Sequence, residues 1–280
     1  MTIASAIGGS GDTRVAWSLP KRIVLTRDVP YAQGARHALD VCRPRTAAAA
    51  PVVVFFYGGG WRSGNKRLYR YVARALARRG YVAVLPDYRI YPEVRYPDFL
   101  VDGAAAVRWT KDNVARFGGD PQKIFLMGHS AGAYIAAMLA VDPVWLRKTG
   151  LAPDRDIAGL IGLAGPYDFL PLRDQTLKII FGGADRPETQ PICHVAPGVP
   201  PALLVTGDAD KVVDPGNSTR FADRLRAAGN DATALIYPRV GHFNIVAALS
   251  PFLWYFAPVL RDTDIFIART LQSRRAQSVS

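Results

Sequence analysis

Residues 124–132 read IFLMGHSAG, and this stretch decides the fold. Four apolar residues stop abruptly at Gly128, and Ser130 then stands among small residues, with Gly132 two positions further on. The residues that follow, YIAAMLA at 134–140, are helical in character. Where a strand is followed by G-x-S-x-G and then by a helix, the chain turns sharply at the serine and exposes it at the top of the sheet. Bulky neighbours would clash in such a turn. We therefore interpret Ser130 as a nucleophile; the alternative is a turn whose small residues only serve packing.

Strand-like and helical segments alternate along the chain from about residue 21. Helical spacing is found, for example, at 68–79 before Gly80 and at 100–117 before Gly118. The alternation predicts an α/β fold with a mostly parallel eight-stranded sheet, helices on both faces and an antiparallel edge formed by the first two strands. Several of the strand segments are the continuous apolar runs of a strand covered on both faces; the eight lie at 22–25, 38–41, 52–56, 81–85, 123–127, 157–163, 202–206 and 233–237.

One main domain is expected at 21–272, with an N-terminal segment at 1–20 before it and a polar tail at 273–280 after it. A chain of 280 residues is long enough to bury one large core. The stretch 166–201 is rich in proline and has no clear period. We expect it to be a short insertion that lies over the strand ends like a lid.

The chain is strongly basic, with 35 basic and 23 acidic residues, a formal charge of +12 and a pI near 10.0. The basic residues are scattered, and no basic helix with interleaved aromatic residues occurs, so a solvated surface explains the charge better than a nucleic-acid partner does. The N-terminal residues lack a signal-peptide pattern, and no stretch reaches the ~18 apolar residues of a membrane span. Cys42 and Cys193 are too few for a disulfide framework and are interpreted as small buried residues. We expect a cytoplasmic protein without stable membrane insertion; no oligomeric state is indicated.

A serine hydroxyl needs a base to activate it, and the base needs an acid to orient it. Of the four histidines, His242 directly follows the last predicted strand, in RVGHFN, and can reach the serine. His129 lies on the serine's own turn and is expected to point away, while His37 begins a strand and His194 lies in the insertion. His242 is therefore the predicted base, with a structural histidine as the alternative.

Three aspartates follow the preceding strand in LLVTGDADKVVDP, namely Asp208, Asp210 and Asp214. We favour Asp210 as the acid, because its loop lets the carboxylate reach back while Val213 anchors the next turn. Asp208 is the rival. Asp214 is better placed to cap a helix that begins near Gly216.

Backbone amides near the serine can bind the negative charge that acyl transfer develops on an oxygen. YGGGW at 57–61 follows a strand, and its glycines let a substrate approach the backbone. We assign the N–H groups of Gly59, Gly60 and Ala131 to this oxyanion hole. The stretch GGWRSGNK nearly fits a phosphate-binding loop, but Asn65 stands where that loop has lysine, so the phosphate interpretation fails.

Serine, aspartate and histidine in this chain order follow the hydrolase-fold pattern and not that of chymotrypsin or subtilisin. The chain resembles the α/β-hydrolase serine esterases, in particular the carboxylesterases related to hormone-sensitive lipase, the isoprenylcysteine methylesterase-like proteins and kynurenine formamidase. The resemblance spans roughly residues 29–270 and rests on LDVCRP, YGGGW, PDYRIYPE, FGGDPQKI, GHSAG and the aspartate and histidine loops. It implies an α/β-hydrolase fold and hydrolysis of carboxylic esters without metal or cofactor. The family usually has histidine at the position of Tyr57, whose hydroxyl could replace that residue's support of the oxyanion loop.

Together these features predict a serine carboxylesterase, lipase-like in chemistry, that acts on small esters of short to medium acyl chains through an acyl-enzyme on Ser130. An amide or formamide hydrolase with the same triad is the alternative, because both reactions pass through one acyl-enzyme. A third hypothesis is a binding protein built on a hydrolase fold that has lost turnover. The insertion and apolar residues near His242 would form a modest acyl pocket, although the same residues could belong to the core; they are Phe243, Phe252, Leu253, Trp254 and Phe256.

Overall fold

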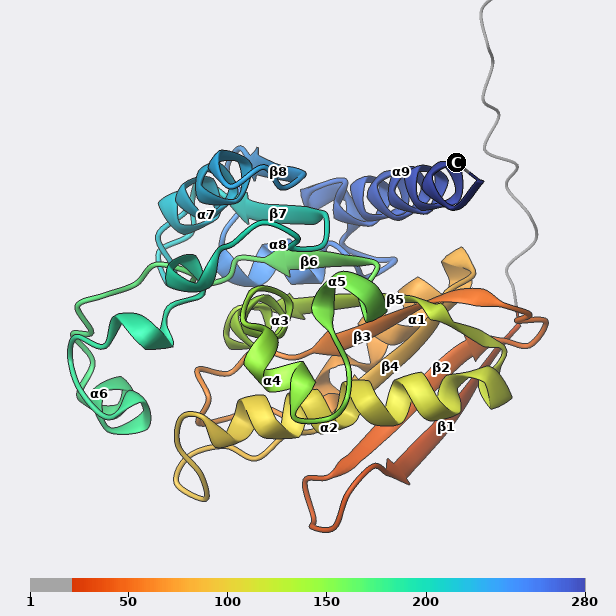
Figure 1. The fold of residues 1–280 in the computed structure, drawn as a ribbon, viewed down its shortest axis with the longest axis horizontal. Helices are drawn as coiled ribbons and strands as arrows, with labels where there is room; N and C mark the ends of the chain where they lie inside the picture. Colours follow the sequence, from red (N-terminus) through yellow and green to blue (C-terminus); the bar gives the residue numbers. More distant parts are fainter. Residues whose placement is uncertain (1–21, 280) are drawn as a thin grey trace, which may run out of the picture.

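An eight-stranded sheet forms the centre of the protein in the computed structural model, which describes residues 22–279 (Figure 1). The strand order is β1-β2-β4-β3-β5-β6-β7-β8. β2 pairs with β1 and with β4 in antiparallel fashion, and the remaining pairs are parallel. The predicted fold class, the antiparallel edge and the eight strand positions are confirmed. The strands are β1 (Ile23–Pro30), β2 (Ala38–Pro44), β3 (Ala50–Phe56), β4 (Val82–Pro86), β5 (Gly119–His129), β6 (Gly159–Leu163), β7 (Ala202–Gly207) and β8 (Ala232–Tyr237).

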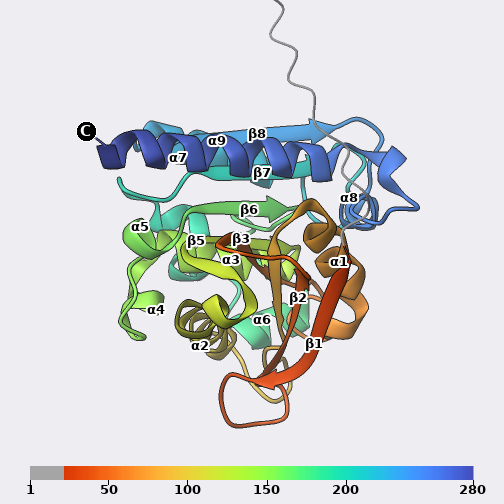
Figure 2. The same ribbon diagram turned by 90° about the vertical axis from the view of Figure 1, so that its right-hand side faces the viewer.

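Helices cover both faces of this sheet. The chain moves from β3 to β4 in one direction and from β4 to β5 in the other, so right-handed crossovers place α1 and α2 on opposite faces, as Figure 2 shows. The predicted helix ends at Gly80 and Gly118 are confirmed, since both glycines adopt a left-handed conformation, with φ of 108° and 78°. The longer helices are α1 (Arg70–Arg79), α2 (Asp98–Asn113), α3 (Ala131–Val141), α7 (Gly216–Ala227) and α9 (Val259–Val279); the shorter ones are α4 (Pro143–Arg147), α5 (Pro153–Asp156), α6 (Gln175–Phe181) and α8 (His242–Ala247).

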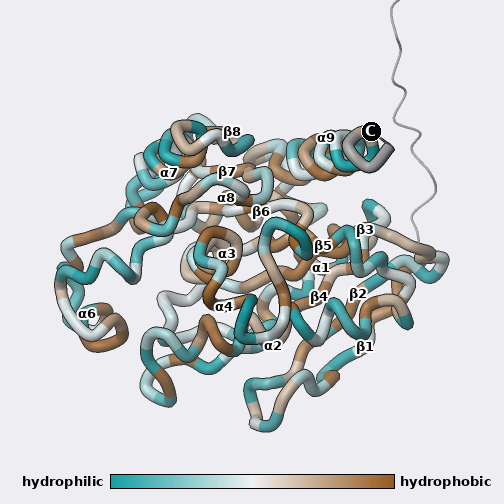
Figure 3. Tube along the Cα trace, viewed as in Figure 1, coloured by the Kyte–Doolittle hydropathy of each residue, from teal (hydrophilic) through white to brown (hydrophobic). Residues whose placement is uncertain are grey.

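α3 is the central helix of the fold. Each of its residues is buried, and it is coloured as hydrophobic in Figure 3. It packs against β5 and β6 on the sheet and against α2 and α4 on its other sides. The helix that begins directly after Ser130 is therefore held rigidly in the core.

The predicted insertion at 166–201 connects β6 and β7, and it contains a helix that the sequence pattern did not indicate. α6 lies at the left edge of the molecule in Figure 1. Asp174 starts this helix by accepting a hydrogen bond from the Leu177 amide, and Gly182 ends it with a φ of 75°. Cys193, in the same insertion, is exposed, so the prediction that it is buried is wrong, whereas Cys42 is buried in β2.

The C-terminal helix α9 continues through most of the segment that was predicted as a polar tail. The helix reaches Val279, the Ser273 hydroxyl donates to the carbonyl oxygen of Arg269 (3.2 Å), and Arg274 donates to that of Arg155 (3.2 Å). The polar residues at 273–276 therefore lie on a largely exposed part of a helix and do not mark its end. The predicted N-terminal segment and the signal-peptide interpretation concern residues 1–21, which lie outside the described residues. Within the described part, no helix has the length and apolarity needed to cross a bilayer.

Candidate active site

Ser130 occupies a strained turn between β5 and α3. Its φ is 53° and its ψ is −122°, a combination that residues with a side chain rarely adopt. A Cβ atom on Gly128 would lie 2.2 Å from the carbonyl oxygen of Gly132, and one on Gly132 would lie 2.1 Å from that of Phe56. The crowding predicted on both sides of the serine is therefore present, and only glycine fits the two positions. The Ser130 amide donates to the carbonyl oxygen of Leu163 (2.9 Å), which ties the turn to β6.

His242 and Asp210 form a buried hydrogen-bonded pair beside this turn. His242 is the first residue of α8, and its Nδ1 lies 2.8 Å from Oδ2 of Asp210. The other carboxylate oxygen accepts from the amides of Val212 (2.8 Å) and Val213 (2.9 Å). Burial acts to raise the pKa of Asp210, but the hydrogen bonds from His242 and the two amides outweigh it and hold the pKa below its usual value. With Nδ1 of His242 bound to a carboxylate, Nε2 is the nitrogen left to exchange a proton.

The rival aspartates of this loop are engaged elsewhere. Oδ1 of Asp208 accepts from the amide of Arg239 (2.5 Å). Asp214 accepts from the amide of Gly216 (3.0 Å), at the start of α7, as predicted for a cap. Of the three aspartates, Asp210 alone is the partner of His242 among the described residues.

The two remaining candidate histidines lie in structural contacts. Nε2 of His37 is 3.0 Å from Asp102, and Nε2 of His194 is 2.7 Å from the carbonyl oxygen of Glu188. Neither is joined to Ser130 or Asp210. Nor do the described residues contain a group of three or more side chains that could hold a metal ion.

His129 does not simply point away from the site, as the sequence suggested. Its ring lies against that of His242, with 4.8 Å between the ring centroids, and its Nε2 is 3.0 Å from the backbone carbonyl oxygen of His242. Its Nδ1 is 3.2 Å from the hydroxyl of Tyr69. Burial lowers the pKa of His129 to about 3, so the ring is neutral at neutral pH. Tyr69 could not be identified from the sequence, because nothing in its position marks it as a neighbour of the serine turn.

The oxyanion loop, residues 57–64 with YGGGW at its start, presents amides without a backbone acceptor in the described part of the chain. Gly59 and Gly60 have φ of 140° and 60°, and a Cβ atom on Gly59 would lie 2.1 Å from the carbonyl oxygen of Ser63. Within residues 22–279, the amides of Gly59, Gly60 and Ala131 donate to no other backbone group. Ala131 is the first residue of α3, where an amide has no acceptor inside the helix. All three amides thus lack a backbone acceptor among the described residues, and their assignment to an oxyanion hole stays a prediction.

Tyr57, at the position where the resemblance implies a histidine, is held by a network of hydrogen bonds that the sequence did not reveal. Nη2 of Arg36 lies 2.8 Å from its hydroxyl oxygen and also 2.8 Å from the carbonyl oxygen of Gly64, at the far end of the oxyanion loop. Nε of Arg36 donates to the carbonyl oxygen of Tyr88 (2.8 Å), and the hydroxyl of Tyr88 donates to the carbonyl oxygen of Tyr57 (2.7 Å). The rings of Tyr57 and Tyr88 stack with 4.5 Å between centroids. Arg36 therefore supports the oxyanion loop at both ends.

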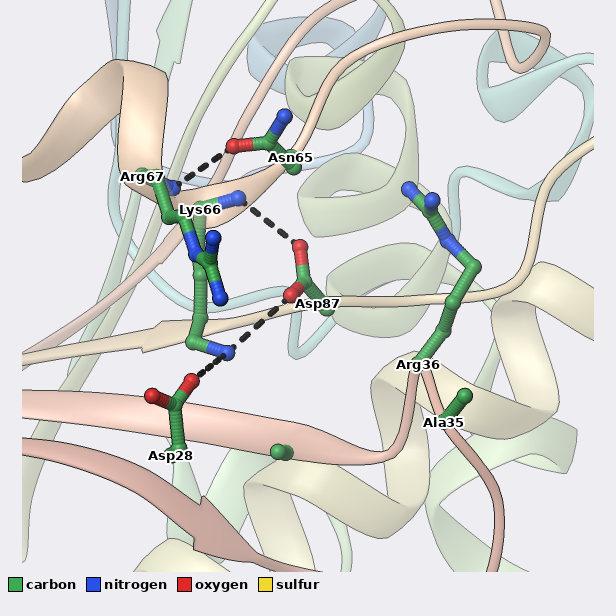
Figure 4. Close-up of a pocket in the computed structure, with 8 residues that line it drawn as sticks. Asp28, Ala35, Arg36, Asn65, Lys66, Arg67 and Asp87 are labelled. Atoms are coloured by element: carbon green, nitrogen blue, oxygen red, sulfur yellow. Dashed lines mark hydrogen bonds and ion pairs between the residues drawn. The ribbon is translucent and has the colours of Figure 1, made fainter.

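Arg36 also lines a cavity of about 440 Å³, drawn in Figure 4. The ammonium group of Lys66 is bound there between Asp28 (2.8 Å) and Asp87 (3.1 Å). None of Ser130, Asp210 and His242 lines this cavity, so it is separate from the candidate site. Its walls are formed by Asp28, Ala35, Arg36, Ala38, Asn65, Lys66, Arg67 and Asp87.

Of the aromatic residues from 243 to 256 that the sequence singled out, only Phe256 is partly buried and packs against the core. The exposed fractions are 68% for Phe243, 83% for Phe252 and 70% for Trp254, so the interpretation of these three residues as core is wrong, and the acyl pocket stays a prediction. Apolar character alone does not tell whether a side chain is covered.

Another aromatic cluster joins the insertion to the oxyanion loop. Trp61, at the end of YGGGW, is buried and packs edge to face against Phe181 of α6 (4.9 Å between centroids) and Tyr134 of α3 (5.2 Å). Phe169 stacks on the same indole at 6.1 Å. The insertion is thereby anchored next to the amides of the oxyanion loop, although the sequence did not identify these contacts.

Known proteins with similar sequences and structures agree with this geometry. Esterase LipC of Mycobacterium tuberculosis is 30% identical over 243 residues, which cover 79% of this chain and 60% of LipC. ICMEL1 of Arabidopsis thaliana, a probable isoprenylcysteine alpha-carbonyl methylesterase, is 28% identical over 243 residues, 78% of this chain and 51% of that protein. The chain thus spans about half to three fifths of the length of these relatives.

A solved structure supports the same assignment. Esterase 2 of Thermogutta terrifontis, phosphonylated by sarin, matches with a TM-score of 0.73 and 25% identity, covering 87% of this chain and 94% of that one. The predicted resemblance to α/β-hydrolase esterases is confirmed. Residues 39–225, more than half of the 280 residues, match the BD-FAE family, and the chain therefore belongs to this family of α/β-hydrolases.

Proposed function

We propose that this protein is a serine carboxylesterase that hydrolyses small esters of short to medium acyl chains. The observation that carries the proposal is the buried pair of Asp210 and His242, 2.8 Å apart, beside a serine in a strained strand-to-helix turn. A carboxylate bound to Nδ1 stabilises the imidazolium that forms when Nε2 takes a proton. His242 thereby becomes a stronger base, which the activation of a serine hydroxyl requires.

The residues act in two stages. Oγ of Ser130 attacks the ester carbonyl carbon while Nε2 of His242 takes the hydroxyl proton, and the amides of the oxyanion loop bind the oxygen that becomes negative. His242 then gives its proton to the departing alkoxide, which leaves as the alcohol. In the second stage His242 takes a proton from water, the resulting hydroxide attacks the acyl-enzyme, and the carboxylic acid is released as Ser130 regains its proton. Asp210 remains ionised throughout.

Relatives support the substrate class. LipC is named an esterase, and esterase 2 of Thermogutta terrifontis is phosphonylated by sarin and, in another structure, holds propionate. Sarin phosphonylates activated serines, and propionate is the acid product of a short-chain ester. The cytoplasmic location and the lack of a nucleic-acid partner, expected from the sequence, belong to the same proposal.

Hydrolysis of p-nitrophenyl esters from acetyl to dodecanoyl, compared between the wild type, Ser130→Ala and His242→Ala, tests the proposal. We expect turnover that is fastest at short chains and falls by about 10³-fold or more in both variants. Ser273→Ala is the matched control, because its hydroxyl bonds only the exposed end of α9. Faster cleavage of an aryl formamide than of any ester would favour the amide alternative. A folded wild type without turnover, or activity that survives in Ser130→Ala, would contradict the proposal.

A further inference from the structure

A continuous set of contacts links the oxyanion loop to the backbone of His242 through Tyr69 and His129. The Tyr69 hydroxyl lies 3.2 Å from Nδ1 of His129, and Nε2 of His129 lies 3.0 Å from the carbonyl oxygen of His242. The amide of Gly58 faces the same Tyr69 hydroxyl and offsets part of the rise in its pKa that burial causes. His242 in turn binds Asp210, so one path joins the loop, the serine turn and the candidate base.

The partners of His129 define its tautomer. A carbonyl oxygen can only accept, so Nε2 of His129 carries the proton and donates to His242. Nδ1 is then unprotonated and accepts from the Tyr69 hydroxyl. The ring, with a pKa lowered to about 3 by burial, stays neutral and keeps this direction of donation at neutral pH.

Packing reinforces this path. A Cβ atom on Gly58 would lie 2.9 Å from Nδ1 of His129 and 3.1 Å from Cβ of Ser130, so the first glycine of the oxyanion loop rests directly on the His129 ring. The residue after His242 is 68% exposed, and the aromatic segment beyond α8 is exposed as well. Buried Ile245 and Val246 anchor the rest of α8, and His129 binds the carbonyl oxygen at the first residue of this helix.

We propose that His129 is a positioning residue, which sets the distance between the imidazole of His242 and the oxyanion amides by binding the His242 backbone and, through Tyr69, the oxyanion loop. The inference rests on the proposed esterase function. His129 touches no reacting atom in this scheme; it acts through His242. The alternative is that its ring only fills space in the core, and the two roles make different predictions for kinetics.

Three variants separate these roles. His129→Leu removes both hydrogen bonds and should lower kcat about tenfold to hundredfold with KM within about twofold, since a misplaced base affects the transition state more than substrate binding. His129→Gln can place its amide nitrogen near the position of Nε2, and we expect it to recover most of the lost kcat. Tyr69→Phe removes the bond to Nδ1 together with the contact to the Gly58 amide, and it should lower kcat by about three- to tenfold.

Tyr81→Phe is the matched control. Its hydroxyl donates to Asp264 (2.8 Å), between β4 and α9, so the variant loses a comparable buried hydrogen bond away from the site. We expect it to lower the melting temperature as Tyr69→Phe does, with kcat unchanged. A low-field proton NMR signal from Nδ1–H of His242 should shift in His129→Leu and Tyr69→Phe and remain in place in Tyr81→Phe.

Unchanged kcat in Tyr69→Phe and His129→Leu, or a His129→Gln variant no more active than the leucine variant, would overturn the inference. If His129→Leu does not fold, the decision rests on Tyr69→Phe and His129→Gln measured against Tyr81→Phe. The NMR signal needs no substrate. A wild type without esterase activity would therefore contradict the proposed function, while the signal would still decide whether His129 positions His242.

Discussion

Arg36 and Tyr57 are joined at 2.8 Å between the guanidinium Nη2 and the phenolic oxygen. The same Nη2 also binds the carbonyl oxygen of Gly64 at 2.8 Å. One side chain from the turn between β1 and β2 thereby connects the start of the oxyanion loop to its end. Where the resemblance implies a histidine, Tyr57 is thus supported by an arginine from another part of the chain.

Replacing Arg36 should consequently impair catalysis more than substrate binding. Arg36→Gln removes the donor to the carbonyl oxygen of Gly64 and leaves the hydroxyl of Tyr57 and the backbone of Tyr88 only the longer bonds between them (3.4 and 3.5 Å), so the amides of the loop should lose their fixed direction. We expect kcat to fall about tenfold to hundredfold with a smaller change in KM. Steady-state kinetics check this, with Arg108→Gln, which breaks an exposed pair with Asp112, as the control. Equal kinetics in the two variants would remove Arg36 from the support of the loop.

Asp210 and Asp208 are two positions apart in the chain, and we expect their replacement to have very different effects on kcat. Asp210→Asn keeps the shape of the side chain but loses the charge that orients His242, and we expect kcat to fall by about 10³- to 10⁴-fold. Asp208→Asn touches only the amide of Arg239 and should stay within about threefold of the wild type. Measuring kcat of both variants at neutral pH shows which aspartate orients His242. A larger loss of kcat in Asp208→Asn would reverse the assignment of the acid.

A methyl group at Gly132 should prevent normal folding. Its Cβ would lie 2.1 Å from the carbonyl oxygen of Phe56 and 2.5 Å from that of Tyr57, in backbone that cannot move without displacing β3. Gly132→Ala should therefore give insoluble protein or a melting temperature lowered by about 10 °C or more. Gly198→Ala is the comparison, because nothing lies within 4 Å of its added Cβ and only its φ of 90° opposes the change. A stable, active Gly132→Ala protein would show that the turn is less crowded than described.

Acidic pH should lower the free energy of unfolding of the protein, partly through protonation of Asp156. Burial acts to raise the pKa of Asp156, but hydrogen bonds from Arg155, the amide of Ala152 and Lys111 lower it to about 2. The pKa in the unfolded chain is about 3.9, so the unfolded state takes up the proton first as the pH falls. The stability that this group contributes is complete above about pH 4 and is lost between about pH 4 and pH 2.

Melting curves of the wild type and Asp156→Asn as a function of pH provide the measurement. The variant should melt several degrees lower at neutral pH, and the difference should shrink as the pH falls toward 2. A constant difference over this pH range would mean that the charge of Asp156 does not contribute.

The sequence predicted those features that depend on local patterns. β3, β7 and residues 124–127 of β5 are mainly apolar runs, and Ser130, Asp210 and His242 each follow a strand at the same edge of the sheet. Their positions could be derived because a parallel sheet places the ends of its strands together. The residues that support them could not, since such contacts join segments far apart in the chain.

Arg36 and Tyr57 are 21 residues apart, and Tyr69 and His129 are 60 apart. No periodicity or motif connects such pairs. α6 was missed for a different reason, because seven residues among prolines show no usable helical repeat. The core alternative for the aromatic residues at 252 and 254 is wrong because hydrophobicity alone does not tell whether a side chain is buried.

The burial of α3 along its whole length also determines where this protein can be altered by design. A helix without a solvent-facing side offers no position for a charged or larger residue, so the serine's immediate scaffold is closed to redesign. New substrate preferences would have to be built into the connection between β6 and β7 and into the segment that follows α8, where exposed side chains can be exchanged without disturbing the core.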